Sequence, residues 1–139
     1  MVALLSAPGT SGGPTPGALL DARARVVHDL AAHGLDAAAH VDAVDAALRE
    51  RRWWLEAWPE GAEHVAGQVA QDVQESLADE HGVHWPRCSL AHPADDGGPA
   101  PAPHVLHVLP DLGPDPHWVC EESGAAAAPL GALPPPAGG

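Results

Sequence analysis

Two short stretches decide the fold of the C-terminal half of this chain: His84-Trp85-Pro86-Arg87-Cys88-Ser89-Leu90-Ala91-His92 and His117-Trp118-Val119-Cys120. Together they hold both cysteines of the 139-residue chain and two of its five tryptophans. Each stretch sets a thiol close to an indole and an imidazole, which is typical of a metal-binding knuckle beside a small core. The sequence therefore predicts that the two stretches meet in space.

The spacing of the thiols and imidazoles predicts a zinc site. Cys88 and His92 form a Cys-x3-His pair, and His117 and Cys120 form a His-x2-Cys pair. Zinc takes about four nitrogen or sulfur ligands in a tetrahedron, and two short pairs joined across a small sheet supply them. We expect these four residues to be the metal ligands, in a zinc-ribbon-like arrangement, with His84 as the alternative to His117.

The same residues allow other interpretations. Cys88 and Cys120 could be small buried hydrophobic residues or, in an oxidising compartment, the two halves of a disulfide. A catalytic zinc would keep an open position beside Cys88, His92 and Cys120, with Glu121 or Glu122 as the base. The sequence contains none of the motifs of zinc proteases, nucleotide deaminases or phosphate-binding loops.

The N-terminal half is predicted to be helical. Apolar residues recur at helical spacing over residues 18–33, over 36–58 and between Pro59 and Gly82. The last of these segments has the clearest pattern, with an apolar residue at every fourth position: Val65, Val69, Val73 and Leu77. We expect Asp36 to cap the second helix, Pro59 to open the third segment and Gly82 to end it. Asp29 is expected on the outer face of the first helix.

Prolines interrupt the chain after Gly82, and only short strands are expected there, over residues 104–109, 117–122 and 126–133. His104 and His107 are three residues apart on the first of these strands, so they face opposite sides and cannot both bind one metal ion.

The expected fold class is α+β, in which a helical hairpin or three-helix packing precedes a small antiparallel zinc-ribbon-like sheet. Residues 1–17 form a disordered tail in this prediction, 18–82 the helical region, 83–133 the small β region with its metal staple, and 134–139 a second disordered tail.

The composition makes the core small. Alanine accounts for 28 residues, whereas Leu and Val together account for 27, and Ile and Phe are absent. Such a core usually needs a metal ion, a disulfide or a partner to stabilise it. The tryptophans must supply much of the buried surface. We expect Trp54, Trp58, Trp85 and Trp118 in the core and Trp53 at the surface.

The charge and hydropathy of the chain limit the classes of partner and the cellular locations that the sequence predicts. Six Arg against 19 Asp and Glu give a net charge of −13, which argues against nucleic-acid binding. No apolar run approaches the roughly 20 residues that cross a bilayer, and residues 1–17 lack the basic start of a signal peptide. The expected location is therefore the cytoplasm, without membrane contact.

The motifs also resemble those of a known group of proteins. Trp85-Pro86-Arg87-Cys88, then His92, then Trp118-Val119-Cys120 and Leu130-Gly131-Ala132-Leu133 resemble the pattern of small uncharacterised proteins common in GC-rich actinobacteria. The resemblance covers about residues 81–133, although Ser89 and Glu121 depart from the usual pattern. It implies a zinc-ribbon-like architecture for the C-terminal part and no particular reaction.

The function that these features favour is a non-enzymatic interaction or structural module with zinc as its cofactor. Its partner would be another protein or a second copy of the chain. The alternatives are a small zinc-dependent enzyme and an acidic adaptor or inhibitor of a basic partner.

Overall fold

The computed structural model describes residues 14–88, 104–110 and 115–135. In these residues, α2 (Pro14–Ala32), α3 (Ala38–Ala57), the 3-10 helix η1 (Pro59–His64) and α4 (Val65–His81) precede three strands. The strands are β1 (His107–Leu109), β2 (His117–Val119) and β3 (Ala126–Pro129). The predicted α+β class is confirmed. Of the expected tails, residues 1–13 and 136–139 lie outside the described residues. The prediction that the first tail extends to residue 17 was wrong, because α2 begins at Pro14.

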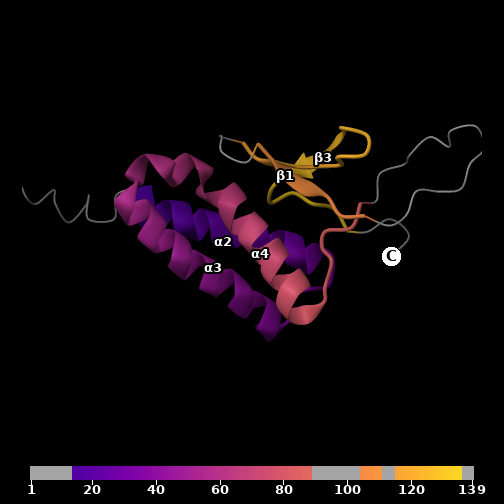
Figure 1. The fold of residues 1–139 in the computed structure, drawn as a ribbon, viewed down its shortest axis with the longest axis horizontal. Helices are drawn as coiled ribbons and strands as arrows, with labels where there is room; N and C mark the ends of the chain where they lie inside the picture. The colour runs from indigo at the N-terminus through magenta and orange to yellow at the C-terminus, as the bar shows by residue number, and fades with distance from the viewer. Residues whose placement is uncertain (1–13, 89–103, 111–114, 136–139) are drawn as a thin grey trace, which may run out of the picture.

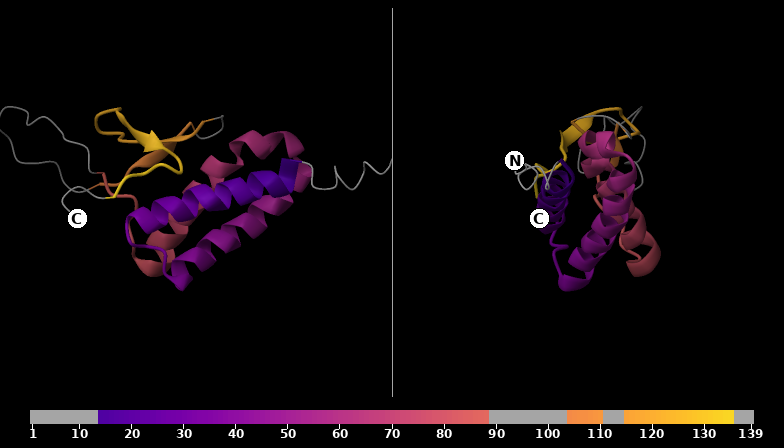
Figure 2. Two further views of the ribbon diagram at one scale, coloured as in Figure 1. Left: turned by 180° about the vertical axis from the view of Figure 1, so that it is seen from behind. Right: turned by 90° about the vertical axis from the view of Figure 1, so that its left-hand side faces the viewer.

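The three α-helices pack against one another, and the sheet lies over α4 and α2, away from α3 (Figure 1, Figure 2). One continuous core joins helices and sheet, and the apolar residues predicted on the α4 stripe, Val65 to Leu77, are all buried in it. None of the described helices is both long and apolar enough to cross a membrane.

The helix ends follow two of the three predicted signals. Gly82 ends α4 in the left-handed conformation with φ of 65°, and the Val83 N–H donates to the Leu77 carbonyl at 2.9 Å. Pro59 opens η1. The prediction for Asp36 was wrong, because Ala37 is the N-cap of α3 and makes no side-chain capping bond.

The strands form an antiparallel sheet in the order β1-β2-β3. Val108 lies opposite Trp118, and Trp118 lies opposite Ala128, so these three buried side chains share the face that meets the helices. The strands have only three or four residues each. A sheet of this size is stable only when packed against other elements.

The tryptophans divide between core and surface. Trp85 and Trp118 are buried and pack edge to face, with ring centroids 5.1 Å apart, as expected for core residues. Trp53 is 72% exposed, which confirms its predicted position. The prediction that Trp58 is a core residue was wrong. It follows the end of α3, is 39% exposed, and packs edge-on against the half-buried Trp54.

A buried carboxylate ties α2 to the C-terminal segment. Asp29 is fully buried, contrary to the prediction that it lies on the outer face of its helix. It accepts hydrogen bonds from Trp118 Nε1 at 2.8 Å, from the Gly131 N–H at 2.7 Å and from the Leu133 N–H at 3.0 Å. His28 Nδ1 also lies 2.8 Å from it. These partners satisfy the carboxylate where water cannot reach it.

Two glutamine side chains of α4 form hydrogen bonds with the backbone at and near β1. Gln74 Nε2 donates to the Trp85 carbonyl at 3.0 Å and to the Leu106 carbonyl at 2.8 Å. Gln71 Nε2 makes a longer bond of 3.4 Å to the Val108 carbonyl. Side-chain amides of α4 thus bind backbone groups at the edge of β1 and in the segment before it.

Replacing the buried carboxylate should weaken the fold. Asp29→Ala leaves buried donors of Trp118, Gly131 and Leu133 without an acceptor, so we expect it to lower the free energy of unfolding by roughly 3–5 kcal/mol. Asp21→Asn is the matched control, because it removes an exposed carboxylate of the same helix, and it should change stability by less than about 0.5 kcal/mol. Denaturant unfolding measures both. Equal effects of the two substitutions would contradict the role of Asp29.

Candidate metal centre

Cys88 is positioned by the segment that leaves α4. After Gly82 the chain turns back toward the sheet, and Arg87 forms an antiparallel bridge with Val105. The Cys88 N–H donates to the His104 carbonyl at 2.9 Å, and the Leu106 N–H donates to the Pro86 carbonyl at 2.8 Å. Cys88 therefore lies directly opposite His104 across a short two-stranded pairing.

His104 lies two residues before Leu106, which in turn precedes the buried Val108 of β1 by two positions. Because side chains alternate along an extended segment, His104 continues the face of Leu106 and Val108 that meets the helices. His107 belongs to the opposite face. Of these two histidines, only His104 is thus directed toward the end of the core.

Cys120 follows β2 directly and begins a tight turn. Its N–H donates to the Ala125 carbonyl at 2.9 Å, and its carbonyl accepts from the Gly124 N–H at 2.6 Å. Gly124 has φ of 77°, a conformation that favours glycine. Cys120 is two positions from Trp118, so both side chains are on the buried face.

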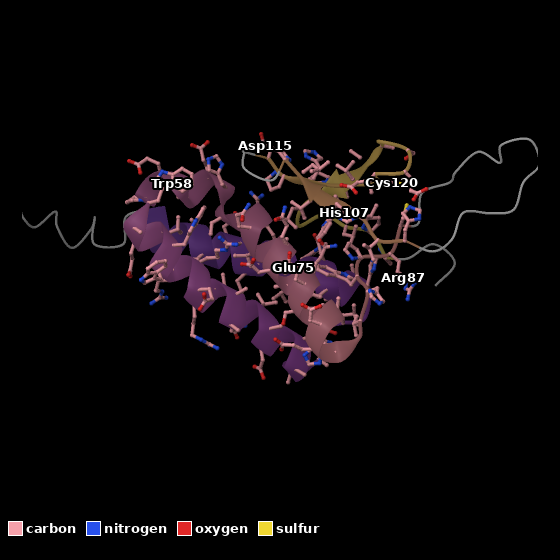
Figure 3. All side chains as sticks on the ribbon, in the orientation of Figure 1. Trp58, Glu75, Arg87, His107, Asp115 and Cys120 are labelled. Atoms are coloured by element: carbon pink, nitrogen blue, oxygen red, sulfur yellow. The ribbon has the colours of Figure 1, made fainter. Side chains whose placement is uncertain are left out.

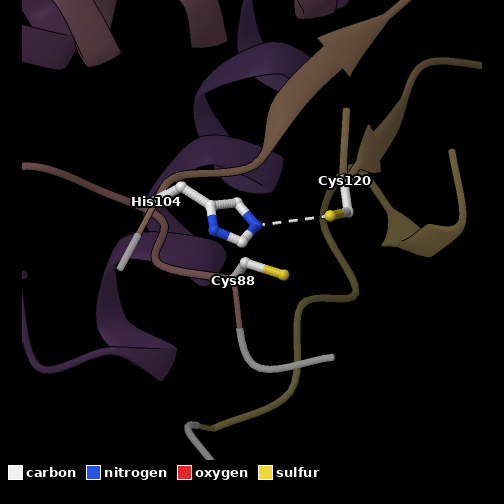
Figure 4. A group of neighbouring side chains, drawn as sticks. All are labelled: Cys88, His104 and Cys120. Atoms are coloured by element: carbon white, nitrogen blue, oxygen red, sulfur yellow. Dashed lines mark hydrogen bonds between the residues drawn. The ribbon is translucent and has the colours of Figure 1, made fainter. Parts of the chain in front are cut away.

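These three segments bring Cys88, His104 and Cys120 together at one end of the sheet (Figure 4). Their ligand atoms all lie within 4.8 Å of one another, and His104 Nε2 is hydrogen-bonded to Cys120 Sγ at 3.3 Å. Cys120 is fully buried, whereas Cys88 and His104 are half-buried. Two thiols and an imidazole at this separation make a group that can hold a metal ion.

The surroundings of Cys120 favour its thiolate, the form that binds metals. Burial raises the pKa of this thiol, but hydrogen bonds from the Ser123 hydroxyl, from His104, from the Ser123 backbone and from Cys88 outweigh burial. Together they lower the pKa from 9.0 to about 6. The residues around this turn thus favour the negatively charged form of the Cys120 sulfur, which can bind a cation.

The structure brings some of the predicted ligand residues together and places others elsewhere. Cys88 and Cys120 belong to the group, and His92 lies outside the described residues. His117 lies on β2 three positions from Cys120, outside the group, with its Nδ1 2.8 Å from the Asp115 carbonyl oxygen. His84, the alternative ligand, is exposed and lines a groove beside α4.

His104 is the member of this candidate group that the sequence reasoning missed, and alternation along the strands is the signal that could have found it. His117 and Cys120 are an odd number of positions apart, so a regular strand sends them to opposite faces. His104 is an even number of positions from Val108, which pairs with Trp118 on the face of Cys120. The alternation argument applied to His104 and His107 also holds for His117 and Cys120.

Two soft sulfur donors and one imidazole suit zinc or another thiophilic divalent ion. The alternative of a catalytic site also requires a base near the metal. Glu121 and Glu122, the expected bases, are exposed on the turn after Cys120, and Glu121 Oε1 lies 3.5 Å from His107 Nε2. This arrangement directs Glu121 toward the outer face of the sheet.

Comparison with known families gives a match over most of the chain. A family model described as a domain of unknown function (DUF8819) matches residues 15–130, which include all of the three helices except Pro14 and all three residues of the candidate metal-binding group. Comparison with curated proteins and with solved structures found no match.

The low pKa of Cys120 predicts a thiolate in the metal-free protein at neutral pH. In the presence of a chelator, ultraviolet thiolate absorbance should rise with a midpoint near pH 6. Because this pKa is lower than that of the unfolded thiol, the ionisation adds stability above about pH 8.5 that is lost as the pH falls through about 6.

Variants identify the thiol that ionises. Cys120→Ser should remove the low-pH step, and His104→Ala should move it to higher pH. Cys88→Ser should retain it, because a serine hydroxyl can replace the Cys88 hydrogen bond to the Cys120 sulfur. Titration of both thiols near their ordinary pKa of about 8.5 would contradict this account of the site.

Proposed function

The chain belongs to this family of unknown function, DUF8819, and from its own site we propose that it is a non-enzymatic module with a structural zinc ion. The ion would hold the C-terminal sheet together and fix it to the segment that leaves α4. The convergence of Cys88, His104 and Cys120 from three separate segments is the observation that carries this proposal.

The geometry of the group supports zinc. In a tetrahedral site with Zn–S of about 2.3 Å and Zn–N of about 2.0–2.1 Å, an imidazole nitrogen and a thiolate sulfur lie about 3.5 Å apart. His104 Nε2 and Cys120 Sγ are 3.3 Å apart. Cys88 Sγ lies within 4.8 Å of both, so a small closing movement of one half-buried side chain completes the three-ligand set.

The fourth ligand that we propose is His92. It follows Cys88 by four positions, and short pairs of this kind are common in structural zinc sites. With His92, the site would have four protein ligands and no open position, as a structural rather than a catalytic zinc requires. A bound water in that position would instead favour the small zinc enzyme.

The small size of the sheet gives the zinc ion its role. Strands of three or four residues offer few backbone hydrogen bonds, so the sheet depends on its attachments. The zinc ion would join three segments: the one that contains Cys88, the one that leads from His104 into β1, and the turn at Cys120. Because the unfolded chain has no preformed site, the free energy of binding would contribute directly to folding.

Zinc binding should be stoichiometric and stabilising. After chelation, one equivalent of Zn²⁺ should bind per chain. Free zinc at a hundredfold excess over its Kd should raise the free energy of unfolding by about 2.7 kcal/mol. Cys88→Ser, His104→Ala and Cys120→Ser should each abolish this stabilisation, as thermal melts with and without zinc will show.

His117→Ala is the matched control, because His117 is another histidine of the same sheet and lies outside the group. It should bind zinc as the parent chain does. The Co²⁺ spectrum of His92→Ala reports on the fourth position, since loss of a protein ligand lets water enter and alters the tetrahedral absorption. Absence of zinc binding, or equal binding by all variants, would refute the metal-binding proposal.

A further inference from the structure

A groove of about 430 Å³ runs between α4 and the edge of β1, and Cys88, His104 and Cys120 are not among its lining residues. Glu75 and Asp79 of α4 line one wall, and His107 and Leu109 of β1 line the other. Figure 3 shows Glu75 and His107 on these facing elements. The groove is therefore bounded by one helix and one strand. Gln74 of the helix is hydrogen-bonded to the Leu106 carbonyl directly before the strand.

The charged side chains of the groove are acidic. Three carboxylates line it, from Glu75, Asp79 and Glu121, and none of the six Arg of the chain does. Two histidines, His84 and His107, are the other ionisable side chains among its lining residues. Three carboxylates with only His107 of the described residues close to one of them, at 3.5 Å from Glu121, create a negative field that attracts basic groups.

The strand that forms one wall is an edge strand. Among the strands that the structure describes, β1 pairs with β2 alone, and on its other side the Arg87–Val105 bridge lies just before the strand. The backbone N–H and C=O groups of every second residue point away from β2. Of these, the Leu106 N–H donates to the Pro86 carbonyl, and the Leu106 and Val108 carbonyls accept from Gln74 and Gln71 of α4. The bond at Val108 is long, at 3.4 Å, and can be exchanged for a shorter backbone bond.

Apolar side chains complete the groove. Val105 and Leu109 line it from the strand side, and Leu109 is 37% exposed. Long basic side chains place their hydrocarbon stems on such surface while their charged ends reach carboxylates. Apolar walls, an edge strand and three carboxylates with no Arg among the lining residues together fit a chain segment that is both extended and basic.

We propose that this groove binds an extended basic segment of a partner protein, which pairs with the edge of β1 and directs Arg or Lys side chains to Glu75, Asp79 and Glu121. The bound segment would exchange backbone hydrogen bonds with Val108 and give charge-assisted bonds to the carboxylates. This inference names the partner class of the proposed module, but its residues are not the metal ligands and it does not rest on zinc.

The probe is a short peptide in which Arg alternates with Val, compared with a peptide of the same composition in which the Arg residues precede the Val residues. Both have the same charge, and only the first places every Arg on one side of an extended strand. Binding to the full chain is measured by calorimetry. The alternating peptide should bind at least about tenfold more tightly.

Two triple variants of equal net charge separate the groove from the bulk acidity of the chain. Glu75→Gln/Asp79→Asn/Glu121→Gln removes the three groove carboxylates, and we expect it to weaken binding of the alternating peptide at least about tenfold. The matched control, Asp42→Asn/Glu50→Gln/Glu56→Gln, removes three carboxylates of α3 outside the groove. It should leave the affinity within about twofold of the parent.

Three results would overturn the proposal: no binding of the alternating peptide, equal binding of the two peptides, or equal losses in the two triple variants. The zinc content of each sample is measured in parallel. A chain that holds zinc but shows no selective peptide binding would refute the groove and leave the metal site standing. Selective peptide binding by a chain without zinc would do the reverse.

Discussion

Asp29 places a buried carboxylate between α2 and the C-terminal segment, and the position of the sheet depends on it. The chain has few large apolar side chains, so hydrophobic contact alone gives the small sheet little to hold it. Three donors, from Trp118, Gly131 and Leu133, converge on this one side chain. Trp118 is central to the sheet and packs against Trp85. The carboxylate thus fixes the middle strand, the final turn and the helix relative to one another.

The sheet has a second polar attachment and a candidate third. Gln74 of α4 donates to the Leu106 carbonyl, directly before β1, and to the Trp85 carbonyl in the segment that leaves α4. Cys88, His104 and Cys120 meet at the end of the core-facing surface, where the segment after α4 and the turn after β2 come together. These three side chains therefore lie where the apolar face of the sheet ends. The proposed zinc ion extends the core by coordination.

Much of the helical half could be predicted from the sequence, because periodic apolar residues and punctuating residues such as Pro59 and Gly82 act locally. The role of Asp29 could not, since its partners lie about a hundred residues away and a charged residue in a helix usually faces water. Both cysteines of the metal-binding group were predicted from their neighbours. His104 required the register of the strands, which short strands among many prolines do not reveal until their pairing is known.

The proposed zinc ion and its ligands are the centre of this account. Zinc K-edge X-ray absorption of the chain purified without added metal tests them most directly. We predict one zinc per chain with two sulfur ligands at about 2.3 Å, from Cys88 and Cys120, and imidazole nitrogen at about 2.0–2.1 Å. In His104→Ala the nitrogen contribution should fall, and in His117→Ala it should not. A zinc-free protein, or a shell of nitrogen and oxygen without sulfur, would contradict the account.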